Sequence, residues 1–235
     1  MDPERHAAGS AITAAAPLAV RRLRGLVAYA DALALQREAH AARRAGTGPD
    51  TLFLLEHAPV VTLGPRTAPG DLRVPAAVLR ARGVEVVETD RGGGITWHGP
   101  GQAVAYPILD LRARGLRPRD YLRFLEALVI GVLADLGVEA GTIEGRTGVW
   151  AGGSKVCAFG VRVAGGVSLH GLALNASPDL AGFGAIVPCG IRDAGVTSLE
   201  RLLGRSPPID EVFDRLERAF LRSGPGPGRA RMGRP

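Results

Sequence analysis

The chain has 235 residues, of which 46% are hydrophobic, so it can bury one sizeable core and is not a disordered polymer. No apolar run approaches the roughly 20 residues of a membrane-spanning helix, and residues 1–16 lack the pattern of a secretory signal. The formal charge of +6 suits acidic partners, and nucleic acid, anionic membranes and acidic carrier proteins all meet that description. A cytoplasmic protein with one α/β domain is therefore predicted.

The two ends of the chain differ in composition from its middle. Residues 1–17 are rich in small side chains without periodicity and are expected to form a flexible segment. Residues 224–235 alternate glycine, proline and arginine without an apolar face, which is typical of a disordered basic tail. Neither an internal repeat nor a linker interrupts residues 18–223, so this stretch is predicted to be a single domain.

The first half of that domain alternates helical and strand patterns. Apolar spacing and turn residues predict a helix over 26–42, a buried strand over 51–56, a turn at Ala58-Pro59 into a short strand ending at Gly64, a short helix over 75–82 and a strand over 84–89. A glycine-rich loop over 91–101 follows, and a strand over 103–109 comes after it. The loop is thus expected between two strands.

The second half begins with a predicted core helix over 119–136, where apolar residues recur at helical spacing before Gly137. Strands are predicted over 148–151, 154–163 and 167–175, with Ala164-Gly165-Gly166 as a hairpin turn. An amphipathic helix over 209–222 is expected to close the domain after Pro207-Pro208.

The loop from Arg91 to Gly101 is the first candidate site. Glycine permits positive φ and close approach of the backbone, so the amide N–H groups of such a loop can converge on a carbonyl or an anion. The loop lacks the lysine and hydroxyl residue that end a nucleotide-binding P-loop. We predict that it lines a ligand pocket, in preference to a purely structural turn, and His98 is favoured over His170 as a functional histidine because it lies in this loop.

Lys155 is the second candidate, because every other one of the 29 Lys and Arg residues is an arginine. Of the two cations, only lysine has a pKa that proteins tune for proton chemistry. In the strand over 154–163, Lys155 is predicted to share one face with Cys157 and Phe159. In a pocket wall Lys155 would be useful beside a thiol, whereas exposure at a sheet edge, or chance survival in an arginine-biased sequence, would leave it without a role.

The two cysteines are the candidate nucleophiles, since they are too few for a disulfide framework or a thiolate metal site. Cys189 lies between Pro188 and Gly190, and this pattern predicts a loop tip that presents a thiol to a pocket. Cys157 lies between apolar neighbours and is either a core residue or the nucleophile, with Cys189 favoured. His170 is interpreted as a core histidine rather than a base.

At these residues the sequence resembles the octanoyltransferases of lipoate biosynthesis, which share a fold with the lipoate and biotin protein ligases. The resemblance extends from about Phe53 to Ile191. Its motifs are EHAPVVTLG at 56–64, RGGGITWHGPG at 91–101, KVCAFG at 155–160, HGLALN at 170–175 and PCG at 188–190. Because several spaced motifs occur in one order, chance similarity is a poor explanation.

The resemblance implies a fold and a set of site residues. The fold is a mixed-sheet α/β (α+β) domain of the biotin/lipoate ligase type with packed helices. Cys189 is implied as the acyl-thioester nucleophile, and Lys155 as the residue that lowers its pKa, with Cys157 then a pocket or core thiol. The implied substrate-binding residues are Arg91, Gly92, Gly93, Gly94, Ile95, Thr96, Trp97, His98, Ala158, Phe159, Gly160, Gly171, Leu172 and Ala173. Neither a metal nor another cofactor is implied.

The resemblance also implies a reaction and its partners. The donor is octanoyl-acyl carrier protein, and the acceptors are lipoyl domains of 2-oxoacid dehydrogenase E2 subunits and the glycine cleavage H protein. An ATP-dependent lipoate or biotin ligase on the same fold is an alternative, but such ligases need no cysteine. A basic nucleic-acid-binding module is a second alternative, against which stands an aromatic content of only 5%. We expect neither nucleic acid nor membrane as a partner.

Overall fold

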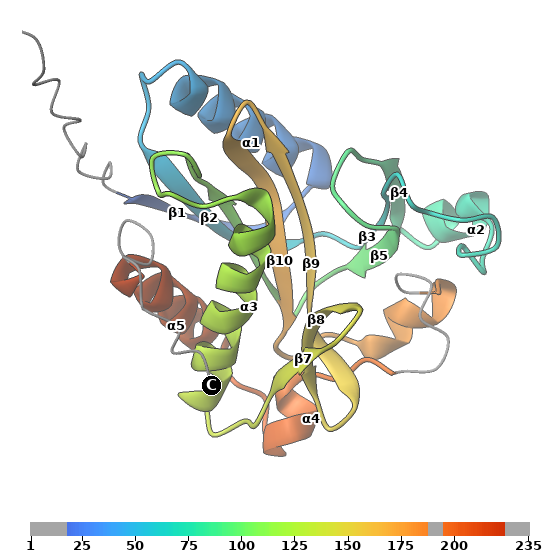
Figure 1. Ribbon diagram of the computed structural model, residues 1–235. Coiled ribbons are helices and arrows are strands. Elements are labelled where there is room, and N and C mark those ends of the chain that lie inside the picture. The colour runs from blue at the N-terminus through green and yellow to red at the C-terminus, as the bar shows by residue number, and fades with distance from the viewer. Residues whose placement is uncertain (1–17, 188–194, 224–235) are drawn as a thin grey trace, which may run out of the picture.

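The computed structural model describes residues 18–187 and 195–223, which form two β-sheets with helices packed on them (Figure 1). The large sheet has the strand order β1-β2-β6-β10-β9-β8-β7. Its strands are β1 (Leu18–Val27), β2 (Asp50–His57), β6 (Gln102–Ile108), β10 (Val167–Asn175), β9 (Ser154–Ala164), β8 (Arg146–Ala151) and β7 (Gly141–Ile143). Strands β1 and β2 are parallel and the other neighbours are antiparallel, so the predicted mixed sheet is confirmed.

The small sheet consists of β4 (Glu85–Glu88), β3 (Val60–Leu63) and β5 (Ile95–His98), in that order. Strand β3 pairs with β4 in parallel and with β5 in antiparallel orientation. The prediction of a loop throughout 91–101 is therefore wrong for β5. The alternating Ile95 and Trp97 side chains are buried in an apolar cluster with Phe183, and this packing makes residues 95–98 of the glycine-rich segment a strand.

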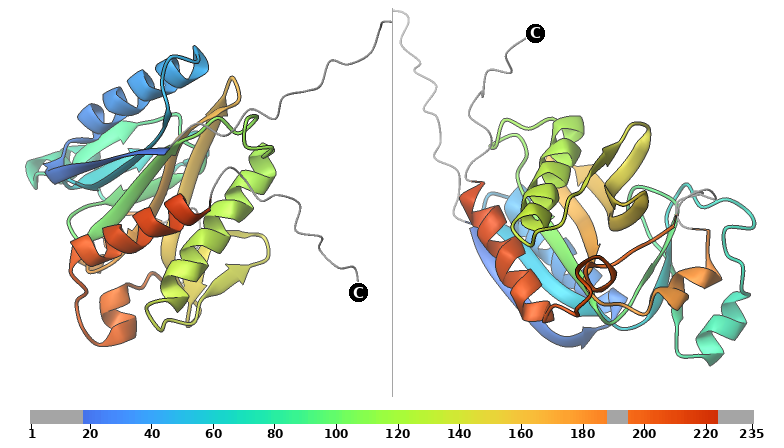
Figure 2. Two further views of the ribbon diagram at one scale, coloured as in Figure 1. Left: turned by 90° about the vertical axis from the view of Figure 1, so that its left-hand side faces the viewer. Right: turned by 90° about the horizontal axis from the view of Figure 1, so that it is seen from below.

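Helices cover both faces of the large sheet (Figure 2). Helix α1 (Tyr29–Arg44) packs on one face, whereas α3 (Pro118–Ala134) and α5 (Ile209–Arg222) pack on the other. The main core lies between the sheet and the α3/α5 layer. The remaining helices are α2 (Ala76–Ala81), the 3₁₀ helix η1 (Leu180–Ala185) and α4 (Leu199–Leu203). No helix in the described part of the chain is long and apolar enough to cross a membrane.

Strand β1 is absent from the sequence predictions, and the predicted helix over 26–42 starts too early. Leu26 and Val27 pair with Glu56 and His57 of β2, so the chain is still extended there and α1 begins at Tyr29. The sequence of β1 contains three arginines in ten positions and no clean alternation. The strand is held by its pairing with β2 and by ion pairs from Arg22 to α5.

The prediction that Lys155 and Cys157 share one face of their strand is wrong. Trp150 of β8 pairs with Lys155 of β9, but the preceding Val149 pairs with Cys157, so the register shifts by one residue. Such a β-bulge reverses the alternation of side chains along the bulged strand. Cys157 consequently lies in the main core, while Lys155 points to the opposite face.

Cys189 and both terminal segments, 1–17 and 224–235, lie outside the described residues. The predicted flexible segment, the basic tail and the domain boundaries at 18 and 223 remain predictions.

Candidate active site

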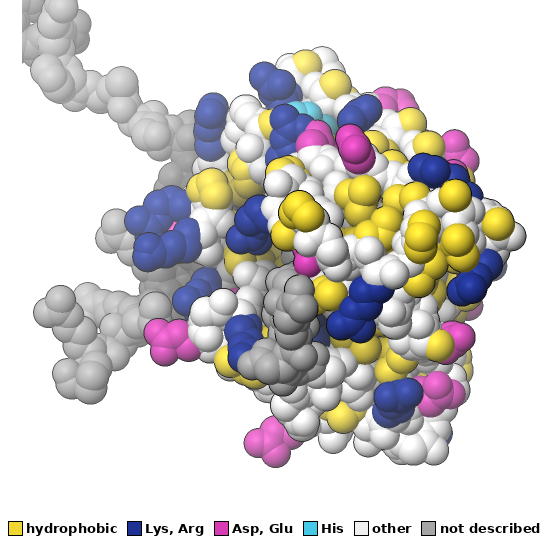
Figure 3. All heavy atoms as spheres, turned by 90° about the vertical axis from the view of Figure 1, so that its right-hand side faces the viewer, with side chains coloured by type: hydrophobic (Ala, Val, Ile, Leu, Met, Phe, Trp, Pro, Cys, Tyr) yellow, Lys and Arg dark blue, Asp and Glu magenta, His cyan; other side chains and the backbone are white. Residues whose placement is uncertain are grey.

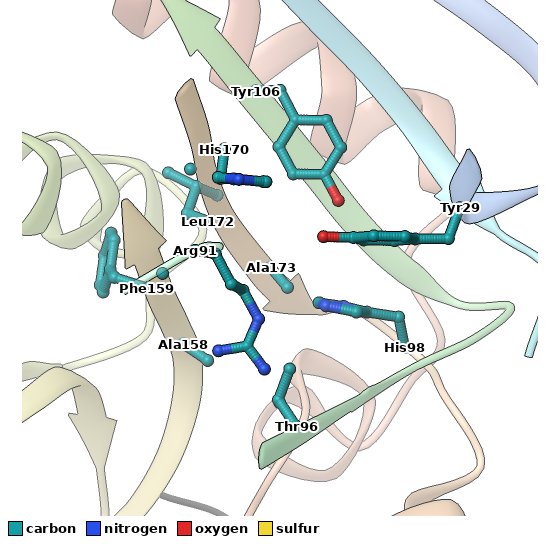
Figure 4. Close-up of a pocket in the computed structure, with 12 residues that line it drawn as sticks. Tyr29, Arg91, Thr96, His98, Tyr106, Ala158, Phe159, His170, Leu172 and Ala173 are labelled. Atoms are coloured by element: carbon teal, nitrogen blue, oxygen red, sulfur yellow. The ribbon is translucent and has the colours of Figure 1, made fainter. Parts of the chain in front are cut away.

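An inner cavity lies between strands β9 and β10 of the large sheet and strand β5 of the small sheet. It is lined by Tyr29, Arg91, Thr96, His98, Tyr106, Ala158, Phe159, Gly160, His170, Gly171, Leu172 and Ala173. Figure 4 shows Tyr29, Tyr106 and His98 gathered at one end of the cavity, with Ala158 and Phe159 on the opposite side. Residues from three distant motifs of the sequence are thus brought around one space.

The glycine-rich segment approaches β9 closely beside the inner cavity. The Gly92 amide donates a hydrogen bond to the Val161 carbonyl at 3.1 Å. A Cβ atom on Gly92 would lie 2.6 Å from that carbonyl oxygen, and one on Gly160 would lie 2.9 Å from Cδ of Arg91. Both contacts are closer than any side chain allows, so glycine is required on both sides of this junction.

Arg91 carries a positive charge into the cavity wall. Its side chain is 6% exposed, and its guanidinium donates to the hydroxyl and the carbonyl oxygens of Thr62 at 2.8 to 3.0 Å. These bonds to strand β3 hold the guanidinium in one place, which suits a group that orients a carbonyl or an anion.

Lys155 connects the inner cavity with the surface. A small connecting cavity shares Thr96, Ala158 and Ala173 with the inner cavity, and Lys155 also lines it. On the other side, Lys155 lines an open hollow, here called the outer cleft, which also contains Arg66, Asp71, Gly93, Gly94 and Arg146. Lys155 is 7% exposed and therefore stands at the boundary between protein interior and solvent.

The backbone of Lys155 is hydrogen-bonded to Gly195 and Thr197, which follow the segment 188–194 in the chain. Its amide donates to the Gly195 carbonyl at 3.0 Å, and its carbonyl accepts from the Thr197 amide at 2.9 Å. The first described residue after the segment that contains Cys189 is thus hydrogen-bonded to Lys155. Gly195 also lies close to Ser154, because a Cβ atom added to Gly195 would lie 3.2 Å from the Ser154 hydroxyl oxygen.

Not all predicted lining residues lie around the inner cavity. Gly93 and Gly94 border the outer cleft instead, and Gly92 packs on the backbone of β9. Ile95 and Trp97 lie in the apolar cluster of the small sheet, where Trp97 packs edge-on against Phe183 with 5.3 Å between ring centroids. Their side chains belong to the support of the site rather than to its surface.

Cys157 is a core residue in this structure. Its side chain is fully buried among apolar neighbours, and burial raises the pKa of its thiol far above the usual value. A thiol in such surroundings stays protonated near neutral pH and is a poor nucleophile.

A chain of hydrogen bonds determines the tautomer of His98. The Thr197 carbonyl can only accept, so Nδ2 of Asn175 donates to it at 2.9 Å, and Oδ1 of Asn175 accepts from Gln102 at 3.0 Å. The remaining amide oxygen of Gln102 then accepts from Nδ1 of His98 at 3.0 Å. Burial, with the nearby His57 and Arg91, lowers the pKa of His98 well below its usual value. His98 is therefore neutral, with Nε2 as a hydrogen-bond acceptor.

His57 and Tyr106 form a second buried pair beside the cavity. Nδ1 of His57 donates to the Val27 carbonyl at 2.9 Å, so Nε2 accepts from the Tyr106 hydroxyl at 2.7 Å. Burial lowers the pKa of His57 to about 4 and raises that of Tyr106 well above its usual value. Both groups are uncharged near neutral pH, so this end of the cavity suits an uncharged ligand.

The model of the lipoyl protein ligase A/B catalytic domain matches residues 28–221. An octanoyltransferase of Chloroflexus aggregans is 51% identical over 82% of this chain and 88% of its own length. An octanoyltransferase of Mycobacterium marinum is also 51% identical, over 87% of each chain. This chain belongs to the octanoyltransferase family.

Membership of the octanoyltransferase family makes the chain an acyltransferase of lipoylation rather than a nucleic-acid-binding module. A crystal structure of lipoate-protein ligase A bound with ATP superposes with a TM-score of 0.68 at 19% identity, covering 89% of this chain and 85% of that protein. This likeness confirms the predicted fold type.

Three residues that line the cavity in this member of the octanoyltransferase family were not predicted as lining residues. Tyr29 is the first residue of α1, and Tyr106 lies in the apolar strand β6. In the sequence, only their hydroxyl groups indicate that a polar group lies nearby. His170 is buried, as predicted for a core histidine, but it also borders the cavity and donates from Nε2 to Asp90 at 2.8 Å. Its φ of 58° is rare for a residue other than glycine.

Proposed function

We propose that this enzyme takes the octanoyl group from octanoyl-acyl carrier protein, holds it as a thioester on Cys189 and transfers it to the lysine of a lipoyl domain. The observation that carries the proposal is the position of Lys155, the one lysine of the chain, between the outer cleft and the cavities behind it. The acyl chain would occupy the inner cavity, where alanine, leucine and phenylalanine side chains provide apolar walls.

In the first half-reaction, the Cys189 thiol loses its proton to Lys155, and the thiolate attacks the thioester carbonyl of the donor. A free thiol with a pKa of about 8.5 is mostly protonated at pH 7, so a neighbouring amine or cation raises the reactive fraction. The bond between the carbonyl carbon and the donor sulfur breaks, and the departing thiolate takes the proton from Lys155. An acyl-enzyme and a free carrier thiol result.

In the second half-reaction, the ε-amine of the acceptor lysine attacks the Cys189 thioester. Lys155 accepts the proton that the attacking nitrogen loses, the carbon–sulfur bond breaks, and Cys189 recovers a proton. The products are an amide and the free enzyme. Thioester exchange is nearly balanced in free energy and amide formation is downhill, so the sequence of steps needs no ATP.

The developing negative charge on the carbonyl oxygen needs donors in both steps. Backbone amides of the glycine-rich segment and of Gly160 are the proposed donors, supported by the place of Gly160 in the wall of the inner cavity and of Gly93 and Gly94 in the wall of the outer cleft. Arg91 is proposed to orient the substrate from the same wall, because its guanidinium is held by Thr62. The other proposed binding residues are those that line the inner cavity and the cleft.

The proposed partners are acidic proteins, namely the carrier protein and the lipoyl domains of E2 subunits and the H protein. The net charge of +6 supports this choice. On the face that carries α2 and the small sheet, the described basic side chains are scattered among apolar and acidic ones (Figure 3). The charge thus favours encounter with acidic proteins without forming one basic patch on this face.

Intact-protein mass spectrometry tests the proposal. The enzyme is incubated with octanoyl-acyl carrier protein, with and without ATP, and then with a lipoyl domain. We expect one octanoyl adduct on the enzyme without ATP, which moves to the lipoyl domain. An adduct on the lipoyl domain that appears only with free octanoate and ATP would instead establish the ligase alternative.

A further inference from the structure

Lys155 lies over the ring of a tryptophan on the neighbouring strand. Trp150 of β8 is its cross-strand partner, and the ammonium nitrogen Nζ lies 4.9 Å from the ring centroid. Trp150 is 4% exposed, and its indole N–H makes no hydrogen bond to any described residue. The ring face, and not the N–H group, is therefore what Trp150 offers to its surroundings, and a desolvated ring face attracts a cation.

A second residue of β8 shapes the space that the Lys155 side chain occupies. Gly148 stands two positions before Trp150, on the same face of the strand, with a φ of 138°. A Cβ atom at Gly148 would lie 2.9 Å from Cε and 3.2 Å from Cδ of Lys155, and 3.1 Å from the carbonyl oxygen of Cys157. Any side chain at position 148 would thus push the aliphatic stem of the lysine out of its present path.

The β-bulge completes this arrangement. Without the register shift between Val149 and Trp150, Lys155 would face the main core as Cys157 does. The bulge directs the lysine to the cavity face, Gly148 leaves room for its stem, and Trp150 lies under its ammonium group. Arg146, whose guanidinium carbon lies 6.0 Å from the centroid of the same ring, lines the outer cleft together with Lys155.

We infer that Gly148 and Trp150 are positioning residues, which together set where the Lys155 ammonium group stands between the outer cleft and the connecting cavity. The inference rests on the proposed role of Lys155 in proton transfer. A proton acceptor must lie within hydrogen-bond reach of the group it serves, and a displacement of about 1 Å can cost about 100-fold in rate.

Gly148→Ala is the direct test, and Gly153→Ala is its matched control. Gly153 also has a positive φ, of 75°, but a Cβ there would meet nothing within 4 Å. The control therefore reports the effect of alanine at a positive φ without a clash against Lys155. We expect Gly148→Ala to lower the single-turnover rate constants of both half-reactions about 100-fold and to leave the KM for the donor unchanged. The same rate constants of Gly153→Ala should stay within a few-fold of wild type.

Because Lys155 is the only lysine, a readout independent of activity is available. Enzyme prepared without a lysine-containing tag and labelled with ¹³C at lysine Cε gives a single lysine NMR signal, and its titration reports Lys155 alone. We expect Trp150→Leu to remove the ring-current shift of this signal and to displace the pH profile of kcat, and Trp150→Phe to restore part of both.

The outcomes separate the inference from the proposed function. If Lys155→Ala is inactive but Gly148→Ala and Trp150→Leu retain wild-type half-reactions and pH profiles, the positioning role is wrong while the role of Lys155 stands. If Lys155→Ala itself retains activity, the proposed function of Lys155 is wrong. Should Gly148→Ala fail to fold, the pH profile of kcat in Trp150→Leu decides, and a profile unmoved from wild type overturns the inference.

Discussion

Ala158 of β9 and Ala173 of β10 are cross-strand partners, and both line the inner cavity as well as the connecting cavity beside Lys155. Their methyl groups therefore stand where the two spaces meet. An acyl chain that is attached near Lys155 and extends into the inner cavity has to pass this pair. At both positions the side chain is a single methyl group.

Substitution of Ala173 by leucine should shorten the acyl chain that the enzyme accepts. Discrimination by one methylene in an apolar pocket is typically about 10- to 200-fold, so we expect the ratio of kcat/KM for octanoyl over butyryl donors to fall at least about 10-fold. Ala151→Leu overpacks the main core away from the cavities and is the control for general damage. An unchanged ratio in Ala173→Leu would show that the chain takes another path.

Replacement of the two cysteines should have opposite consequences. Cys189→Ala removes the proposed nucleophile and should lower turnover by at least about 10³-fold. Cys157→Ala leaves a small gap in the core, so it should cost about 1 kcal/mol of unfolding free energy while acyl-enzyme still forms. Peptide mapping after acylation is the measurement, and an octanoyl label on Cys157 of the wild-type enzyme would reverse the assignment.

Lys155→Arg keeps the charge but removes the proton acceptor, because arginine stays protonated at any working pH. We expect some acyl-enzyme formation, since a cation still favours the Cys189 thiolate, but a loss of about 10²- to 10⁴-fold in transfer to the lipoyl lysine. Single-turnover measurements of each half-reaction separate the two effects. Turnover within a few-fold of wild type would mean that Lys155 acts only through its positive charge, and His98 would then be the first candidate for the general base.

Acid should destabilise the fold through its buried histidines. Burial lowers the pKa of His57 from 6.5 to about 4, so between these values the unfolded chain binds a proton that the folded chain does not. The stabilisation is fully present above pH 6.5, and about 3 kcal/mol is lost as the pH falls to about 4. Urea unfolding across this range measures it. His57→Gln keeps a hydrogen-bond donor and an acceptor, and it should make the unfolding free energy depend less on pH. If the slope of the unfolding free energy against pH is unchanged in this variant, His57 is not the source of the pH dependence.

Patterns of apolar residues along the chain predicted those helices and strands that are determined by their own sequence. The apolar spacing of 119–136 and 209–222 corresponds to helices α3 and α5, and the apolar run at 167–175 corresponds to strand β10. Strand β1 was missed because its arginines are held by partners on β2 and α5, far along the chain. Tyr106 was missed for the same reason, since only folding brings it to His57 and to the cavity.

By itself, the amino-acid sequence determined the motifs, the mixed α/β class and the family resemblance, because these depend on which residues occur and in what order. It also singled out Lys155 as the only lysine. Only the tertiary structure decided that Cys157 is enclosed in the core and that Lys155 turns away from it toward the cavities. The physical reason is the register shift between β8 and β9, which depends on two paired strands and leaves no trace in the periodicity of either one.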